Sequence, residues 1–462
     1  MNRIVIALLL TCFLFSCTMA PKYTRPEAPV PSDWPGGPAY KKTAGEAAPR
    51  IMWQDFIQSE QVRKVIELSL ANNRDLRVSA LNIERARATY RIQRAQLLPT
   101  VDAQGTFSKE RVPGILSGTG QPLTTELYNL NVGITAWEID FFGRIRSLKD
   151  QALELYLATE QARRSAQTAL IAEVANACLA LAADRENLKL ARSTLEAQEA
   201  TYKVIRRRYE VGASSELDLR QAQTRVETAR VDIARYTGLI AMDENAINLL
   251  AGSPVAAGLL PEELDANTVL QDFSAGLPSE VLLNRPDIMQ SENLLKAANA
   301  NIGAARAALF PRIALTTSIG TTSDALSGLF TGGASTWSFV PQIVIPIFDP
   351  RTWAAYDVVK VEREIAQAQY EGAIQTAFRE VADALARRGT VDDQLRAQQD
   401  LVFASAESYR LSNLRYTKGI DTYLSVLDSQ RSLYASQQAL ISLRLARLTN
   451  LVNLYKALGG GA

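Results

Sequence analysis

RYEVGASSELDLRQAQ at 208–223 and RYTKGIDTYLSVLDSQ at 415–430 align without a gap. Arg, Tyr, Gly, Leu and Gln stand at matching places in the two stretches. Self-similarity at a fixed spacing is the mark of a repeated architecture, and missing it misassigns the whole fold. The chain is therefore predicted to be built from two copies of one structural unit.

A second pair of phrases supports the duplication. AQLLPT at 95–100 is matched by AALFPR at 307–312, at a slightly larger spacing than the first pair. The second copy is thus shorter than the first between Pro311 and Arg351, where a loop change is tolerated. The predicted organisation is a first repeat, a linker with scattered Gly and Pro, a second repeat and a short tail, at 59–250, 251–278, 279–458 and 459–462.

Long helices make up most of each copy. Arg144–Glu210 contains neither Gly nor Pro, and a helix of that length extends about 100 Å at 1.5 Å per residue. The second copy repeats it at 351–418, interrupted only by Gly372 and Gly389. A helix before the strands and a returning helix complete each copy, predicted at 59–98 and 216–251 in the first and at 280–309 and 422–458 in the second.

The quoted phrases stand where the long helices end. Gly212 and Gly419 are suited to the residue just past a helix, because Gly tolerates the left-handed conformation. Each phrase is therefore a turn between two antiparallel helices. The candidates for the N-caps of the returning helices are Ser214 or Ser215 and Asp421 or Thr422.

Two strand-like segments precede each long helix. In the first copy Leu130, Val132 and Ile134 alternate with Asn129 and Asn131, a period of two that indicates one apolar and one polar face. Strands of about ten residues also suit a tilted crossing of a bilayer. A soluble hairpin packed on helices is the alternative. The four strands are predicted at about 101–109, 128–137, 312–320 and 337–348.

Composition excludes several classes of function. The net charge is +1, so no global basic field points to nucleic acid, and none is expected as a partner. The chain has no His, which removes the commonest general base and most zinc sites. Three Cys, at 12, 17 and 178, build no disulfide framework. Cys178 lies among small residues and is expected to be a packed structural thiol. No catalytic residue, metal site or cofactor is predicted.

The N-terminus carries a targeting signal. Residues 1–16 combine an early Arg3 with an apolar run too short to span a bilayer, as in a signal peptide. The run ends in LFSC at 14–17, which predicts lipid attachment at Cys17 and stable anchoring by several acyl chains. The residue after the Cys is Thr18 and not the Asp that commonly retains such lipoproteins in the inner membrane, so the outer membrane is favoured. An ordinary cleavage site with an incidental Cys is the alternative. Residues 17–58, rich in Pro, are expected to form an extended tether.

Four strands cannot close a barrel, and open sheet edges are not tolerated in hydrocarbon. Three chains supply twelve strands, an even number within the outer-membrane range. The predicted fold is therefore mainly α-helical with a transmembrane β-barrel. In it a duplicated unit of long helical hairpins plus two strands gives four strands per chain to a barrel that several chains close, with a ring of long helices below it.

Five phrases of the sequence are distinctive when taken together: LFSC at 14–17, PKYTRP at 21–26, NRPD at 284–287, RYTKGIDTYLSVLDSQRSL at 415–433 and NLYKALGGG at 453–461. In these phrases the sequence resembles the TolC/OprM family of outer-membrane efflux channels, in its lipoprotein branch. The resemblance runs from Cys17 to the C-terminus. It implies a homotrimer with a 12-stranded barrel in the outer membrane and an α-helical barrel in the periplasm, which works with a periplasmic adaptor and an inner-membrane pump, often of the RND type. It implies export of drugs, dyes, detergents, metals or small secreted molecules.

The resemblance also implies site residues. Leu424, Asp428 and Arg431 match the face that lines the periplasmic constriction, and their spacing puts them on one side of a helix. Ser425 stands where some relatives carry a second acid. An exposed Asp428–Arg431 pair on a solvated helix is the simpler alternative. The expected adaptor-docking tips are the turns themselves, with Tyr209, Gly212, Tyr416 and Gly419, whose other interpretation is plain helix capping.

Three classes of function are alternatives to an efflux channel: an enzyme, a structural tether and a secretion channel. An enzyme is disfavoured, because no acid and nucleophile cluster accompanies the absence of His. A structural coiled-coil lipoprotein tether explains the helices and the lipid. It does not explain the two predicted β-hairpins, which stand at equivalent places in the two repeats. A type I-like secretion channel for peptides or proteins fits the same architecture as an efflux channel, and the sequence leaves it open.

Overall fold

The computed structural model describes residues 18–41, 51–270, 273–275, 278 and 282–460. The predicted signal peptide, 1–16, and Cys17 lie outside this part of the chain. The structure divides into two compact units, each of which collects segments from both repeats. The first holds residues 1–27, 82–159 and 290–370, and the second holds residues 28–81, 160–289 and 371–462.

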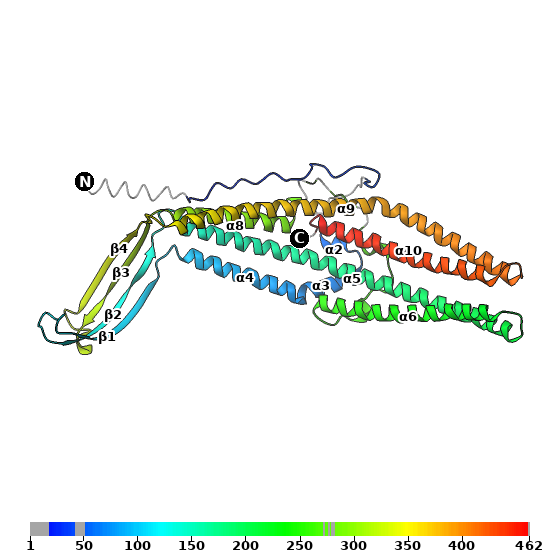
Figure 1. Cartoon of the computed structure of the whole chain (residues 1–462), viewed down its shortest axis with the longest axis horizontal. Helices are drawn as coiled ribbons and strands as arrows, with labels where there is room; N and C mark the ends of the chain where they lie inside the picture. The colour runs from blue at the N-terminus through cyan, green and yellow to red at the C-terminus, as the bar shows by residue number, and fades with distance from the viewer. Residues whose placement is uncertain (1–17, 42–50, 271–272, 276–277, 279–281, 461–462) are drawn as a thin grey trace. The chain divides into compact units, whose positions relative to one another are not determined.

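The first unit contains one antiparallel sheet in the order β1-β2-β3-β4 (Figure 1). Each repeat contributes a hairpin, and the two hairpins join through pairing of β2 with β3. Among the described residues the outer strands β1 and β4 each pair on one side only, so both edges of this sheet are open there. The strands are β1 (Val101–Val112), β2 (Leu123–Glu138), β3 (Arg312–Ser323) and β4 (Ser335–Val344).

The predicted strands exist, but their ends differ from the prediction. β1 and β2 run further toward their loop than expected, and the added pairs include Lys109 and Glu126, whose Nζ and Oε1 lie 2.6 Å apart. β3 is likewise longer than 312–320. β4 ends at Val344 rather than at 348, because Pro346 has no N–H to continue a ladder.

The register divides the side chains of the sheet between two faces. One row of paired residues runs Ala103, Val132, Ile319 and Trp337 across all four strands. Other rows on this face add apolar residues such as Leu130, Ile134 and Phe339, together with Thr317 and Thr321 and, toward the loop, the Lys109–Glu126 pair. A bulge between Ile134 and Trp137 inserts one residue and returns Trp137 to the same face. The opposite face carries small polar residues, among them Gln104, Thr106, Asn129, Asn131, Thr316, Ser318, Thr336 and Ser338.

The long helices follow the sequence closely. α5 (Arg144–Glu210) and α6 (Glu216–Ala251) have the predicted bounds. α9 (Pro350–Thr417) is one helix, as predicted at 351–418, and it continues through Gly372 and Gly389. Its returning partner is α10 (Tyr423–Ala457), one residue shorter at each end than expected. α8 (Pro286–Ala307) is shorter than 280–309 and begins with a Pro, which suits a first helical position.

The helix predicted over 59–98 is wrong as a single element. It is divided into α3 (Glu60–Asn72) and α4 (Arg74–Ala95) at Asn73, whose backbone leaves the helical region. The side-chain oxygen of Asn73 accepts from the N–H of Leu76 and caps α4 at 2.9 Å. Its Nδ2 donates to the carbonyl oxygen of Leu250 at 3.0 Å, near the end of α6. The break therefore lets α3 meet the returning helix end to end.

The predicted tether, 17–58, is also more ordered than expected. Residues 18–41 have neither helix nor strand, as predicted. Further on, the short helix α2 (Trp53–Phe56) and a bridge from Ile57 to Val269 belong to the packed second unit. Phe56 is 1% exposed and stacks on Tyr455 with ring centroids 3.9 Å apart.

The core of the second unit is centred on the middle of α5. Leu170, Val174, Cys178 and Leu181 are buried there and belong to one cluster with residues from α3, α10 and the α2 region. Among the described helices α5 alone contains a stretch apolar enough to cross a membrane, and 61% of that stretch is buried inside the protein. Its hydrophobicity is thus accounted for by helix packing.

Candidate functional site

The two helical hairpins of the second unit end in the same turn. Gly212 and Gly419 have φ of 74° and 72°. In the first turn the N–H of Ala213 donates to the carbonyl oxygen of Arg208, five residues back, and Gly212 donates to Tyr209. Ile420 and Gly419 repeat both bonds in the second. This is the Schellman arrangement, which satisfies helix-end carbonyls and favours Gly, so the predicted C-terminal caps are confirmed.

The returning helices start differently in the two copies. Ser215 is the N-cap of α6 and forms a capping box with Asp218. Thr422 is the N-cap of α10, but its side chain makes no capping bond. Instead Asp421 pairs with Arg415 across the turn, and this ion pair lowers the pKa of Asp421. The same helix turn is thus closed by a capping box in one copy and by an ion pair in the other.

A polar contact and an apolar cluster join the two hairpins near their tips. Nη1 of Arg208 donates to the hydroxyl oxygen of Tyr416 at 3.1 Å, and its guanidinium lies 5.2 Å from the ring centroid. Beside it, Ile205 of α5 and Tyr423 of α10 are buried in a small apolar cluster with Ala222, Val426 and Leu427. Tyr209, predicted with the tips, is 40% exposed and lies outside this cluster. Composition gave no sign that Arg208 would bridge the hairpins.

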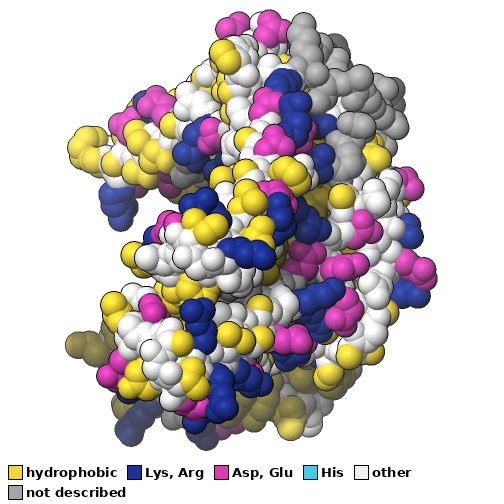
Figure 2. Space-filling view, turned by 90° about the vertical axis from the view of Figure 1, so that its right-hand side faces the viewer, with side chains coloured by type: hydrophobic (Ala, Val, Ile, Leu, Met, Phe, Trp, Pro, Cys, Tyr) yellow, Lys and Arg dark blue, Asp and Glu magenta, His cyan; other side chains and the backbone are white. Residues whose placement is uncertain are grey.

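The tip surface is charged in both signs. Viewed from the ends of the hairpins, Lys and Arg side chains alternate with Asp and Glu side chains, and apolar side chains lie between them (Figure 2). Arg206 and Glu210, for example, form an exposed pair on α5 at 3.1 Å. Such a surface offers a partner protein both charge partners and apolar contacts.

The predicted gate residues lie on the exposed side of α10. Leu424 is 62% exposed, and Nη2 of Arg431 lies 2.5 Å from Oδ1 of Asp428. Tyr423, Val426, Leu427 and Gln430 form the buried side of the same stretch. The structure therefore brings Asp428 and Arg431 together and presents them, with Leu424, away from the packing of their own chain. This placement fits both a pore lining and a solvated helix face.

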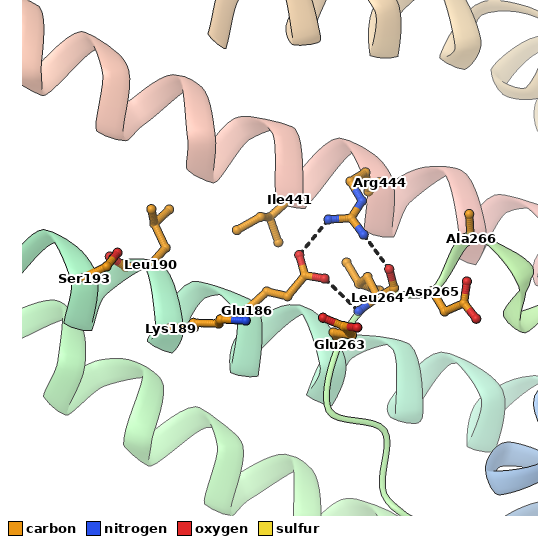
Figure 3. A pocket seen from close by; sticks show the side chains of 10 residues that line it. All are labelled: Glu186, Lys189, Leu190, Ser193, Glu263, Leu264, Asp265, Ala266, Ile441 and Arg444. Atoms are coloured by element: carbon orange, nitrogen blue, oxygen red, sulfur yellow. Dashed lines mark hydrogen bonds and ion pairs between the residues drawn. The ribbon is translucent and has the colours of Figure 1, made fainter. Parts of the chain in front are cut away.

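The linker between the repeats is clamped onto α5 and α10, which the sequence did not indicate. Glu186 of α5 accepts from the N–H of Leu264 at 2.8 Å and from Nη1 of Arg444 at 2.7 Å. Arg444 of α10 also donates to the carbonyl oxygen of Leu264 (Figure 3). Next to it Arg185 donates to the carbonyl oxygen of Pro261 at 2.9 Å. These bonds tie two helices of different repeats to one stretch of linker, beside an open pocket of about 740 Å³.

An acid pair links α5 and α6 beside this clamp. Burial, and then the charge of Asp184, raise the pKa of Asp243 to about 6. The pKa of Asp184 is also raised, chiefly by burial. The two carboxyl groups are within hydrogen-bonding reach of each other, and such a bond forms only when one of them is protonated.

The end of the sheet is locked to the start of α5. Both carboxylate oxygens of Glu138, in β2, accept from Arg144 at 2.8 Å, and Arg312 of β3 lies 2.6 Å from one of them. Asp140 caps α5 through the N–H of Arg146 at 2.9 Å. This network holds the strand-to-helix junction of the first unit. Within the described part of the chain, no group of three or more His, Cys, Asp or Glu side chains is placed to hold a metal ion.

Comparison with known proteins agrees with this architecture. The family model for outer membrane efflux proteins matches residues 65–253 and 277–460, one segment per repeat. The toluene efflux pump outer membrane protein TtgC and the antibiotic efflux pump outer membrane protein ArpC, both of Pseudomonas putida, are each 50% identical over 466 residues, which is 100% of this chain and 96% of each relative. The open state of the MtrE outer membrane channel of Neisseria gonorrhoeae superposes with a TM-score of 0.86 at 37% identity, over 96% of this chain and 98% of that one.

These matches confirm the predicted fold class, the outer-membrane location and the role as a passive efflux channel rather than an enzyme. Channels of this kind are the outer-membrane component of tripartite pumps and work with a periplasmic adaptor and an inner-membrane pump. Two matched segments, one in each copy of the duplicated unit, cover most of the sequence, and relatives align from end to end. The chain therefore belongs to the outer membrane efflux protein family.

Proposed function

We propose that three copies of this chain form the outer-membrane conduit of a tripartite pump that exports antibiotics and small apolar toxic compounds. The observation that carries the proposal is the four-stranded sheet with two open edges, one apolar face and one polar face. An open edge leaves backbone N–H and C=O groups unpaired, which hydrocarbon does not tolerate. Pairing of β4 of one copy with β1 of the next closes a twelve-stranded barrel.

The two faces of the sheet supply the two environments of such a barrel. Apolar rows such as Ala103, Val132 and Ile319 suit contact with lipid. The opposite face, with Asn131 and Ser318, suits a water-filled interior. Its polar groups are small and mostly uncharged, which favours passage of solutes over tight binding.

The substrate class is inferred from the relatives. Two of them are named for toluene and for antibiotic efflux, and this chain aligns with both over its full length. Their likeness supports export of aromatic solvents and antibiotics here. An outer-membrane conduit does not itself need to recognise these compounds, since specificity can reside in the pump that supplies them.

Lipid attachment at Cys17 remains part of the proposal. It rests on LFSC at 14–17 and the Pro-rich stretch that follows. Several acyl chains on one residue give stable anchoring. Labelling with radioactive palmitate is expected for the wild type and lost in Cys17→Ala. Because the barrel itself holds the protein in the membrane, transport should fall only in part. Equal labelling of the variant would exclude Cys17 as the acceptor.

The gate is proposed at the exposed face of α10. Three copies would bring three Asp428 carboxylates and three Leu424 side chains to one ring, with Arg431 as the nearest counter-charge. The tips, with Tyr209, Gly212, Tyr416 and Gly419, would receive the adaptor. Preferential binding of the adaptor to the open state would then supply the energy for spreading the hairpins.

Gene deletion with complementation tests the function. The deletion strain should accumulate ethidium, several antibiotics and toluene, and plasmid-borne wild type should restore efflux. A version lacking both hairpin tips, 208–215 and 415–422, should reach the outer membrane but fail to restore efflux. Normal efflux in the deletion strain together with loss of a secreted peptide or protein would instead assign the chain to a secretion system.

A further inference from the structure

The PKYTRP motif at 21–26 lies against α8 in the first unit, and efflux does not explain it. Its stretch is extended, without helix or strand, as expected for a segment with Pro at both ends. The residues of α8 that meet it lie on one face of the helix, at positions 292, 296, 299, 303 and 306. Their spacing of three and four residues places them in a single stripe along the helix.

Glu292 is the centre of this contact. Its side chain is 6% exposed and lies 2.7 Å from Nη2 of Arg25. Nε of Arg25 donates to the other carboxylate oxygen at 3.0 Å, so the pair is bidentate. The hydroxyl of Tyr23 also donates to Glu292, at 3.1 Å. Lys296 completes the group, 3.2 Å from the carboxylate and 5.4 Å from the ring centroid of Tyr23.

The segment is held further along by its backbone. Nδ2 of Asn299 donates to the carbonyl oxygen of Pro21 at 2.8 Å, and Arg306 donates to that of Met19 at 3.3 Å. Between them Gly303 leaves room for Ala20: a Cβ at Gly303 would lie 2.6 Å from the backbone nitrogen of Ala20. The helix thus has donors for two carbonyl oxygens and a notch for one backbone.

The two partners match in length. From Glu292 to Arg306 the helix rises about 21 Å at 1.5 Å per residue. From Met19 to Arg25 an extended chain covers about 20 Å at roughly 3.3 Å per residue. Because the two lengths agree, an extended segment that runs antiparallel to the helix can contact every polar position of the stripe. A loose tether would not be expected to match the helix in this way.

We infer that PKYTRP is a self-recognition sequence, and that α8 carries a built site for an extended peptide bearing Tyr and Arg two residues apart. Residues 18–27 are its occupant and act as a strap rather than a tether. Among the described residues the cations paired with Glu292 are Arg25 and Lys296, so without the strap Lys296 is left. Glu292 also faces Glu154, whose own pKa is raised by burial. A buried carboxylate that loses its bidentate partner is strongly disfavoured, so the docked strap is part of the folded unit. It holds the start of the described chain beside the end of α8, next to β3.

Limited trypsin digestion of the purified, detergent-solubilised full-length protein tests the strap. Trypsin can cut after Lys22, which is exposed, but cleavage needs local release of the chain around it. The bond after Arg25 precedes Pro26 and resists the enzyme. Intact-mass measurement of the cut at Lys22 over time therefore reports strap opening. We expect Arg25→Ala and Glu292→Gln each to speed this cut by about ten-fold or more.

Matched variants keep the result interpretable. Thr24→Ala, an exposed position between the two anchors, should cut at the wild-type rate. Arg25→Lys keeps the positive charge but loses the two-nitrogen contact to the carboxylate, so its cleavage rate should lie between those of the wild type and Arg25→Ala. If Arg25→Ala or Glu292→Gln does not fold, the cleavage rate of Arg25→Lys can still be compared with that of the wild type. Wild-type cutting as fast as in Arg25→Ala, or equal rates in Arg25→Lys and wild type, would overturn the self-recognition site.

Discussion

Arg208, at the end of α5, reaches across to Tyr416, at the end of α9, and donates a hydrogen bond to its hydroxyl at 3.1 Å. It links the two hairpins of one chain close to their tips, and Tyr434 of α10 links them again further along by donating to Asp232 of α6 at 2.9 Å. The equivalent residue of the second repeat, Arg415, stays within its own turn and pairs with Asp421. The two copies thus use the same arginine in different ways, one between hairpins and one inside a hairpin.

The Arg208–Tyr416 link should restrain the tips. Arg208→Ala removes a hydrogen bond and a cation–π contact, together worth about 1–2 kcal/mol at a partly exposed site. We expect a higher resting conductance in planar bilayers, because the hairpins separate more easily. Arg206→Ala is the matched control, since Arg206 pairs with Glu210 on its own helix. Equal conductance in both variants would show that the link does not restrain the tips.

The gate makes a separate prediction. Asp428→Ala should lower cation selectivity, because rings of acidic side chains favour cations in pores. Replacing Leu424 and Arg431 together with Ala should raise resting conductance. Glu216→Ala, which removes the acid of an exposed pair on α6, controls for loss of any surface charge. Unchanged selectivity and conductance with intact trimers would return Asp428 to the role of a solvated helix residue.

The acid pair between α5 and α6 predicts a pH dependence of stability. The pKa of Asp243 rises from 3.8 to about 6 in the folded protein, so the folded state binds its proton more tightly than the unfolded chain does. Stability associated with this group is fully present below pH 3.8 and is lost as pH rises through about 6. Asp243→Asn should therefore raise the melting temperature at pH 7.5 and leave it nearly unchanged at pH 4.

Glu227→Gln, on the exposed side of the same helix, is the control for the pH experiment. Its melting temperature should follow that of the wild type at both values. A melting temperature for Asp243→Asn that lies below wild type at pH 7.5 would mean that the carboxylate is stabilising, and the assignment of the raised pKa would fail.

Cys178 should be chemically inert. It is fully buried in α5, and burial raises the pKa of its thiol to about 12, which suppresses the reactive thiolate. A maleimide reagent should label it only after unfolding in denaturant. Cys178→Ala should keep the trimer and its export activity. Rapid labelling of the native protein, or loss of export with an intact trimer, would point to a functional thiol.

The sequence was sufficient where structure is decided locally. The long helices were predicted from stretches with little or no Gly and Pro, and their C-terminal caps from the turn residues Gly212 and Gly419. The strands were found from their period of two, although their ends depended on the pairing of neighbours. Gly389 lies inside the continuous α9, and its lack of a side chain makes room for the chain at Ala39, because a Cβ there would clash with the carbonyl oxygen of Ala39.

The sequence did not predict features that depend on contacts between residues far apart along the chain. Asn73 ends a helix because its side chain caps the next one and bonds to Leu250, far along the sequence. Arg25 is a lone basic residue in a Pro-rich stretch, and only the fold shows that it meets the buried Glu292. The clamp of Glu186 and Arg444 on the linker is likewise spread over three separate segments. Local sequence patterns do not indicate such contacts.

Each chain supplies four strands, and three chains are expected to close them into one barrel. Native mass spectrometry of the protein released from detergent micelles measures the number of copies, and circular dichroism of the same sample measures β-structure. We expect a complex of three copies with its full β-content, which persists until β-structure is lost. A stable monomer that retains the complete β-signal, or a complex with a different number of copies, would contradict it.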